Sequence, residues 1–122
     1  MNPEFASIQK HPKSWGEEVW ITNNELYCGK ILNFKKGSEF SMHYHIKKDE
    51  TWAVMSGKLI MRFFDLRNAE EKEVELNYGD TVHLKPCVPH KLIALEDSSV
   101  FEVSTQHFES DSYRIQKGDS QK

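Results

Sequence analysis

The sequence has few cysteines and no long apolar segment. Only Cys28 and Cys87 occur among 122 residues, too few for a disulfide scaffold and typical of two reduced thiols. No run of about 18 apolar residues is present, so no segment is predicted to span a membrane. The first residues lack an apolar stretch of signal-peptide length, so a cytoplasmic location is expected.

An excess of basic residues is also missing. Lys and Arg total 16 against 19 Asp and Glu, and the formal net charge is −3. Nucleic-acid-binding domains usually carry a basic stripe, so no nucleic-acid partner is expected. The hydrophobic fraction of 38% is enough for one compact core. A chain of this length is near the modal size of one domain.

Helical periodicity is weak, whereas short strand-like segments recur between turn-prone pairs such as Ser56-Gly57. About nine such strands predict an all-β fold, an antiparallel barrel or sandwich. Arg67–Lys72 is the one segment that suits a helical turn, and it suits a loop equally well. The predicted strands are Val19–Thr22, Leu26–Phe34, Phe40–His45, Thr51–Met55, Lys58–Leu66, Glu73–Leu76, Thr81–Lys85, Lys91–Leu95 and Ser99–Thr105.

The two ends of the chain differ from the middle. Residues 1–14 are polar, contain Pro3 and Pro12 and show no period, so they are expected to form a loosely held N-terminal arm. Residues 116–122 are expected to form a solvated tail. A single barrel domain is predicted between them, over residues 15–115.

His43 and His45 are separated by one residue. On a strand they point to the same side and can meet one ion, whereas on a helix they would lie about 200° apart. Glu50 follows after a four-residue gap that suits a short loop. Zinc, iron, manganese and nickel all accept imidazole and carboxylate ligands. Taken alone, such a histidine pair is more often an ordinary surface or core feature.

The spacing around this pair resembles the first signature of the cupin superfamily. The matching residues are Gly37, His43, His45, Glu50 and Gly57. The resemblance implies a single-domain cupin, a jelly-roll barrel also described as a double-stranded β-helix, over roughly residues 30–105. It also implies one divalent transition metal (Zn, Mn, Fe or Ni), held by His43, His45, Glu50 and His90.

The second cupin signature is matched by Gly79-Asp80 and by His90, eleven residues after that glycine. Two positions depart from the family pattern. Lys85 stands where proline is usual, and Cys87 stands where the turn glycine is usual. A different backbone shape is therefore expected in this turn.

Short segments outside the two motifs suggest a narrower resemblance. They are similar to small cupins related to the C-terminal mannose-6-phosphate isomerase domain of bifunctional sugar-nucleotide enzymes. This resemblance implies isomerisation or epimerisation of a sugar, sugar phosphate or nucleotide-linked sugar, with the metal as a Lewis acid. The segments are Tyr27–Lys30, Leu95–Asp97, Glu102–Thr105 and Glu109–Arg114.

A proton must then move between adjacent carbons, which requires a titratable side chain. Glu102 and His83 are the candidate catalytic residues, in that order. The candidates for substrate binding are Lys30, Arg62, Trp52 and Arg114. Surface ion pairing or core packing is the alternative role for each of these residues.

Two other functions stay open from sequence alone. Three histidines and a glutamate also suit the ferrous iron of a cupin dioxygenase, and a non-catalytic cupin would bind a small molecule without turnover. In each case the partner is a small molecule. A homodimer is also expected, because cupins resemble one another in pairing barrels through edge strands or an N-terminal arm.

Overall fold

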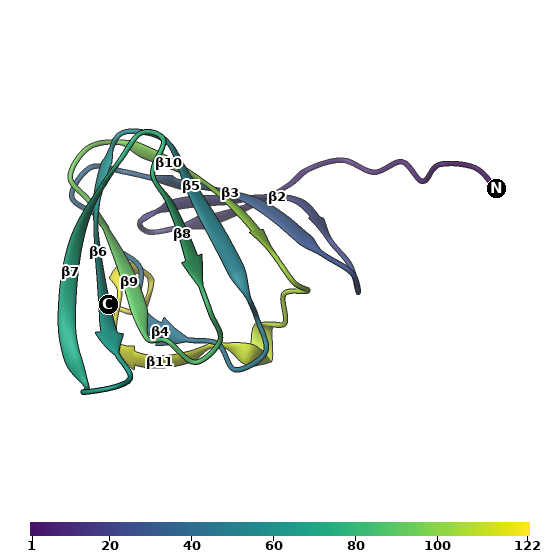
Figure 1. The fold of residues 1–122 in the computed structure, drawn as a ribbon. Coiled ribbons are helices and arrows are strands. Elements are labelled where there is room, and N and C mark those ends of the chain that lie inside the picture. The colour runs from purple at the N-terminus through teal and green to yellow at the C-terminus, as the bar shows by residue number, and fades with distance from the viewer.

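Two antiparallel sheets face each other in the computed structural model, which describes residues 1–122 (Figure 1). One sheet has the strand order β1-β2-β3-β10-β5-β8, and the other β11-β4-β9-β6-β7. This is the predicted all-β jelly roll. The strands are β1 (Gln9–Lys13), β2 (Gly16–Asn23), β3 (Cys28–Phe34), β4 (Met42–Tyr44), β5 (Glu50–Ser56), β6 (Lys58–Asp65), β7 (Glu70–Asn77), β8 (Thr81–Leu84), β9 (His90–Ala94), β10 (Ser98–Ser104) and β11 (Tyr113–Gln116).

Two short 3₁₀ helices, η1 (Glu109–Asp111) and η2 (Asp119–Gln121), complete the secondary structure. No helical segment has the length and apolar character needed to cross a membrane. The nine predicted strands are all present, with ends that differ by a few residues. Arg67–Lys72 is not helical: it forms a turn and then enters β7. The Asp65 carboxylate stabilises this turn by accepting the Arg67 backbone N–H at 2.9 Å.

Alternation along three neighbouring strands divides the interior of the barrel into an apolar end and a polar end. The register places Glu102 opposite both Trp52 and Lys30, so these side chains share the inner face. The apolar end belongs to the hydrophobic core, and the polar end is left to build a site. From the apolar to the polar end, the inward residues are Val54, Trp52 and Glu50 on β5, Val100 and Glu102 on β10, and Leu32 and Lys30 on β3.

The hydrophobic core joins the two sheets. Its members come from both sheets and from the segment before β2, so burial of this one cluster holds the sandwich together. Phe40 packs at its border, next to the polar end. The core residues are Trp15, Leu32, Phe34, Trp52, Val54, Leu59, Met61, Leu76, Leu84, Leu92, Ala94 and Val100.

The expectation of a loose arm over residues 1–14 is wrong for its second half. Gln9–Lys13 forms β1 and pairs with β2, from Gln9 opposite Trp20 to Lys13 opposite Gly16. This strand lies at a sheet edge, where Pro12 is tolerated because its missing N–H is not needed in the ladder. Only residues 1–8 extend away from the barrel (Figure 1).

Residues 116–122, expected to form a solvated tail, keep mostly exposed side chains but are held against the barrel. Asp119 exchanges hydrogen bonds with the backbone of Glu39, at 2.9 and 3.0 Å. Ser120 accepts hydrogen bonds from the backbone and the hydroxyl of Ser14. Gly118 lies so close to Phe40 that an added Cβ would be 2.4 Å from its carbonyl carbon. Hydrogen bonds and close backbone contact therefore hold this segment against the barrel, although it has no apolar side chains to bury.

We expect the protein to be a homodimer in solution. Residues 1–8 carry exposed Phe5 and Ile8, and both outer strands of the six-stranded sheet, β1 and β8, have an unpaired edge. A second copy of the chain would cover these edges and apolar side chains, which favours dimer formation. Light scattering should give twice the chain mass, and truncation of residues 1–8 should lower it. A mass near 14.3 kDa for the full chain at working concentration would contradict this prediction.

Candidate metal centre

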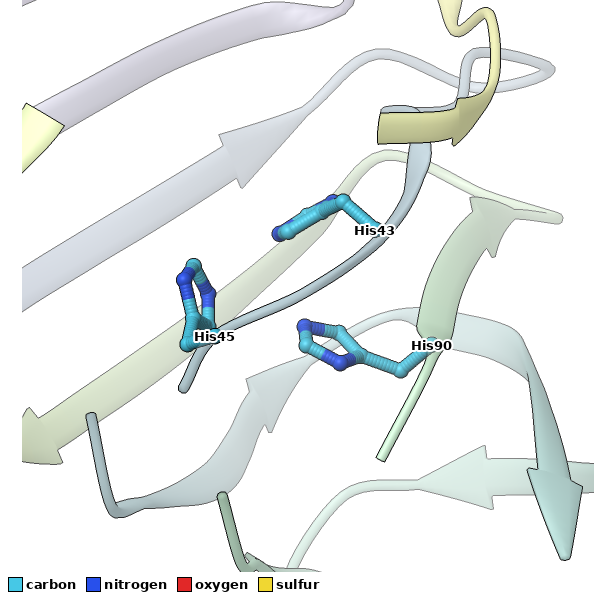
Figure 2. Close-up of side chains that lie close together, drawn as sticks. All are labelled: His43, His45 and His90. Atoms are coloured by element: carbon cyan, nitrogen blue, oxygen red, sulfur yellow. The ribbon is translucent and has the colours of Figure 1, made fainter. Parts of the chain in front are cut away.

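The imidazoles of His43, His45 and His90 converge at the polar end of the barrel (Figure 2). One ring nitrogen from each lies within 4.8 Å of those of the other two. His43 and His45 are i and i+2 at the end of β4, which turns them to the same side. His90 begins β9 and lies directly opposite His43 in the antiparallel register. The strand pairing therefore brings the two sequence motifs together.

Each of the three rings uses its Nδ1 atom for a hydrogen bond to a backbone carbonyl. Because a carbonyl oxygen only accepts, the Nδ1 atoms must carry the hydrogens. The Nε2 atoms of the neutral rings then keep a free lone pair, as in histidines that ligate metals. The accepting carbonyls belong to Ser41 at 2.6 Å, Asp111 at 2.8 Å and Val88 at 2.9 Å, for His43, His45 and His90 respectively.

The Glu50 carboxylate lies beside His45, next to the cluster of three histidines, and is the candidate fourth donor. Its Oε1 accepts a hydrogen bond from the Trp52 indole at 2.6 Å, which fixes the carboxylate. Its Oε2 is buried, has no hydrogen-bond donor and lies 3.5 Å from the Nε2 atom of His45. A buried carboxylate oxygen without a partner is costly unless a cation binds it. Three imidazole nitrogens and this oxygen fit a divalent transition metal.

The protonation states of the three histidines also suit a metal. Burial lowers the pKa of His43 to about 4, and burial likewise lowers the pKa of His45 and His90. The rings are therefore neutral at pH 7, which is the form that binds metal. Burial, aided by the nearby Glu102 carboxylate, raises the pKa of Glu50. A bound cation would favour the ionised form of Glu50.

A buried network of charged groups lies next to the four donor atoms. Lys48 contacts Glu102 at 2.8 Å and His107 at 3.2 Å, and Lys30 contacts Glu18 at 3.2 Å. Burial opposes ionisation of Glu102, but the ammonium groups of Lys48 and Lys30 outweigh it and hold the pKa of Glu102 below its usual range. Glu102 is therefore an ionised carboxylate beside the metal ligands.

These groups line a cavity of about 150 Å³ at the polar end. Only three of its 19 lining residues are hydrophobic. Arg114 on β11 lies opposite His43 on β4, so its side chain shares a face with that ring. Ser120 and Gln121 of the C-terminal segment line the cavity as well. Such a cavity suits a ligand with several hydroxyl or charged groups.

The structure separates the sequence-predicted residues into three groups. Glu102, Lys30 and Arg114 line the cavity together with the four predicted metal ligands. Trp52 is only 1% exposed and contacts Glu50, so it supports a ligand and has no surface for a substrate.

His83 and Arg62 do not belong to this site, which corrects the prediction for both. His83 points outward from β8 and pairs with Asp49 at 2.7 Å. Arg62 points outward from β6 and pairs with Glu73 at 3.0 Å. Their side chains are 53% and 44% exposed. Both pairs are surface ion pairs, which contribute little to stability.

Sequence analysis missed Lys48, Glu18 and His107 as cavity residues. The pairing of β2 with β3 explains the place of Glu18: it lies opposite inward-facing Leu32, two residues before Trp20, which lies opposite Lys30. Lys48 and His107 lie in loops, where no periodicity indicates orientation.

Cys87 adopts the left-handed conformation with φ 75°, at the position where the family pattern has glycine. Such a conformation costs a residue with a Cβ roughly 1–3 kcal/mol. Glycine relieves this strain but loses more conformational entropy on folding. The net expectation for Cys87→Gly is a rise of about 1 kcal/mol in the free energy of unfolding. Urea denaturation measures this change.

Gly79 provides the matched control, since it has φ 88° and free space around an added Cβ. Gly79→Ala should lower stability by a similar amount. A loss of stability in Cys87→Gly would show that the thiol makes a contact that outweighs the backbone strain.

Comparison with known proteins agrees with this architecture. The Cupin domain family model matches residues 30–105, and no curated protein sequence matches the chain. The capsular polysaccharide assembling protein CapF from Staphylococcus aureus is similar in structure, with a TM-score of 0.76 and 18% identity over 92% of this chain and 33% of that chain. A variant of oxalate decarboxylase from Bacillus subtilis has a TM-score of 0.78 and 16% identity, over 88% of this chain and 30% of that chain.

This chain thus spans about a third of each of these solved proteins, and at such identities the likeness concerns the fold alone. The narrower resemblance to the mannose-6-phosphate isomerase domain stays a prediction. The family model covers well over half of the chain, both signature motifs lie within the match, and their histidines converge in space. The chain belongs to the cupin family.

Proposed function

We propose that this protein is a metal-dependent isomerase or epimerase of a sugar, sugar phosphate or nucleotide-linked sugar. The observation that carries the proposal is the buried Glu102 carboxylate, which lines one cavity with the four predicted metal ligands and with few apolar residues. A ligand in this cavity meets acid and base groups together with hydrogen-bonding side chains. This combination supports proton transfer on a polyhydroxylated molecule.

A divalent metal held by His43, His45, Glu50 and His90 would supply Lewis acidity to the carbonyl and the neighbouring hydroxyl oxygen of the substrate. For isomerisation, Glu102 takes the proton from the hydroxyl-bearing carbon next to the carbonyl and returns it to the carbonyl carbon, while the hydroxyl proton moves to the carbonyl oxygen. Epimerisation instead returns a proton to the same carbon from the opposite face, which requires a second proton donor there. The Lys48 ammonium, 2.8 Å from the Glu102 carboxylate, keeps that carboxylate ionised before the reaction.

Lys30 and Glu18 lie further along the same inner face, where their charged ends can hydrogen-bond substrate hydroxyls. Arg114, on β11, lines the cavity near His43 and suits a phosphate or another anionic substituent, because a guanidinium can make paired hydrogen bonds to it. A phosphorylated substrate would thus place its anionic end near β11 and its reactive carbons near the metal ligands.

Proton exchange with solvent tests this function. Protein loaded in turn with Zn²⁺, Mn²⁺, Fe²⁺ or Ni²⁺ is incubated in D₂O with aldose and ketose phosphates and nucleotide sugars. NMR should then show deuterium at the carbon next to the carbonyl, together with formation of the isomer or epimer. Absence of both deuterium exchange and isomer or epimer formation, with every sugar and every metal, would contradict the proposal.

The main competitor is oxidation by an iron-dependent cupin dioxygenase, since the same four donors suit ferrous iron. The oxalate decarboxylase to which the fold is similar is described with Mn(II) centres, so a protein of similar fold holds a divalent transition metal. An oxygen electrode separates the two functions. Oxygen consumption by the Fe²⁺-loaded protein with a small organic acid or thiol, without sugar turnover, would favour oxidation.

A further inference from the structure

The C-terminal segment, residues 109–121, contacts the metal centre at Asp111. Asp111 ends the 3₁₀ helix η1 and is only 4% exposed. Its backbone carbonyl accepts the Nδ1 hydrogen bond of His45 at 2.8 Å. A single residue far along the chain therefore sets the ring orientation of one metal-ligand histidine.

The Asp111 carboxylate holds the loop between His45 and Glu50. Its two oxygens accept hydrogen bonds from the backbone N–H groups of Ile46, Lys47 and Lys48, at 2.9 to 3.2 Å. These residues lie between strands, so no ladder partner serves their amides. Hydrogen bonds from amides to a buried carboxylate are among the stronger ones in proteins. The path of the chain from His45 to Glu50 is therefore set by one side chain.

We propose that Asp111 is a positioning residue of the metal centre, through which the C-terminal segment determines metal affinity. It fixes His45 through its carbonyl and the approach to Glu50 through its carboxylate, so two of the four donors depend on it. Loss of the carboxylate would let the loop shift and the Glu50 oxygen move away from the imidazoles. Partners that orient metal ligands typically contribute 10–100-fold to metal affinity.

The same segment forms part of the cavity wall, through Ser112, Arg114, Ser120 and Gln121. Contacts between a ligand and this wall are therefore transmitted to the metal donors through a buried hydrogen-bonded residue. The inference rests on the metal centre alone and does not depend on the proposed sugar chemistry.

Cobalt binding provides the test, because Co²⁺ absorbs visible light in a way that reports its coordination. Asp111→Asn preserves the shape of the side chain and the backbone carbonyl but removes the charge that the three amides share. It is expected to weaken Co²⁺ affinity by about 10–100-fold, measured by competition with a chelator. The visible spectrum of the bound ion should change as well.

Asp119→Asn is the matched control. Asp119 lies in the same segment and accepts a backbone hydrogen bond from Glu39, but it has no contact with the ligand loop. Its substitution should leave Co²⁺ affinity and the spectrum unchanged. If Asp111→Asn does not fold, as circular dichroism would show, Asp111→Glu serves as the second variant, because it keeps the charge and displaces the loop.

Wild-type affinity and spectrum in the folded Asp111 variant would overturn the inference while leaving the metal centre intact. An equal loss of affinity in Asp119→Asn would overturn it too, because general loosening of the segment would then explain the effect. A wild-type protein that does not bind Co²⁺ would overturn the metal centre itself, and the inference with it.

Discussion

His45→Ala is expected to reduce metal affinity by at least about 100-fold and to abolish metal-dependent turnover. The substitution removes one of three imidazole donors, and the Oε2 atom of Glu50 loses its neighbouring ligand. Because metal-orienting partners alone contribute 10–100-fold, loss of a direct ligand should cost more. Competition with a chelator and elemental analysis after dialysis measure the change.

The barrel should remain folded in this variant. His45 lies at the polar end and is not a member of the hydrophobic core, and its loss leaves one Asp111 carbonyl without its partner, at a cost of about 1–3 kcal/mol. His83→Ala is the matched control, since His83 is an exposed histidine that pairs only with Asp49. Equal metal affinity in His45→Ala and wild type would show that His45 is not a ligand.

Glu102→Gln is expected to lower kcat by about 100- to 10,000-fold while metal binding persists, as is usual for removal of a general base. The substitution keeps the size of the side chain and leaves all four metal donors in place. It removes the charge that balances Lys48, which contacts Glu102 at 2.8 Å. Loss of one partner from a buried pair is destabilising, so a lower melting temperature is expected as well.

Steady-state kinetics and metal analysis on the same preparation separate these effects. Glu102→Asp is the companion variant, because it keeps the charge beside Lys48 and withdraws the carboxylate by one carbon. It should retain more stability than Glu102→Gln and intermediate turnover. Full turnover of the true substrate by Glu102→Gln would place the base elsewhere, even if the protein proves to be an isomerase.

The metal ligands could be predicted from the sequence because their positions depend on strand geometry. Residues i and i+2 on a strand share a face, so His43 and His45 had to point together. The spacing of the two cupin motifs then added Glu50 and His90. The structure agrees for the three histidines, whose rings converge, and it places Glu50 beside His45.

The same alternation could have corrected two of the site predictions. Apolar Leu59 and Met61 alternate inward on β6, which turns Arg62 outward. On β8 the inward positions are taken by Val82 and Leu84, which turns His83 to solvent. Both residues were predicted to belong to the site because they can carry a charge, without regard to the face of the strand on which they lie.

Other parts of the structure leave no local signal in the sequence. β1 is a polar edge strand without a buried face, so it shows no period, and β11 is an edge strand of only four residues whose apolar Tyr113 and Ile115 are exposed. The C-terminal segment is held by hydrogen bonds that join residues distant in sequence, such as Asp119 to Glu39. Asp111 belongs to the same class: its partners Ile46 and Lys47 are more than 60 residues away.

A crystal structure of the zinc-loaded protein, with anomalous data at the zinc edge, would show whether His43, His45, Glu50 and His90 bind one ion. One anomalous peak per chain is expected at the polar end of the barrel. It should lie about 2.0–2.2 Å from the Nε2 atoms of His43, His45 and His90 and from the Oε2 atom of Glu50. A zinc ion bound only at other residues, or no ion within bonding distance of these four side chains, would contradict the account.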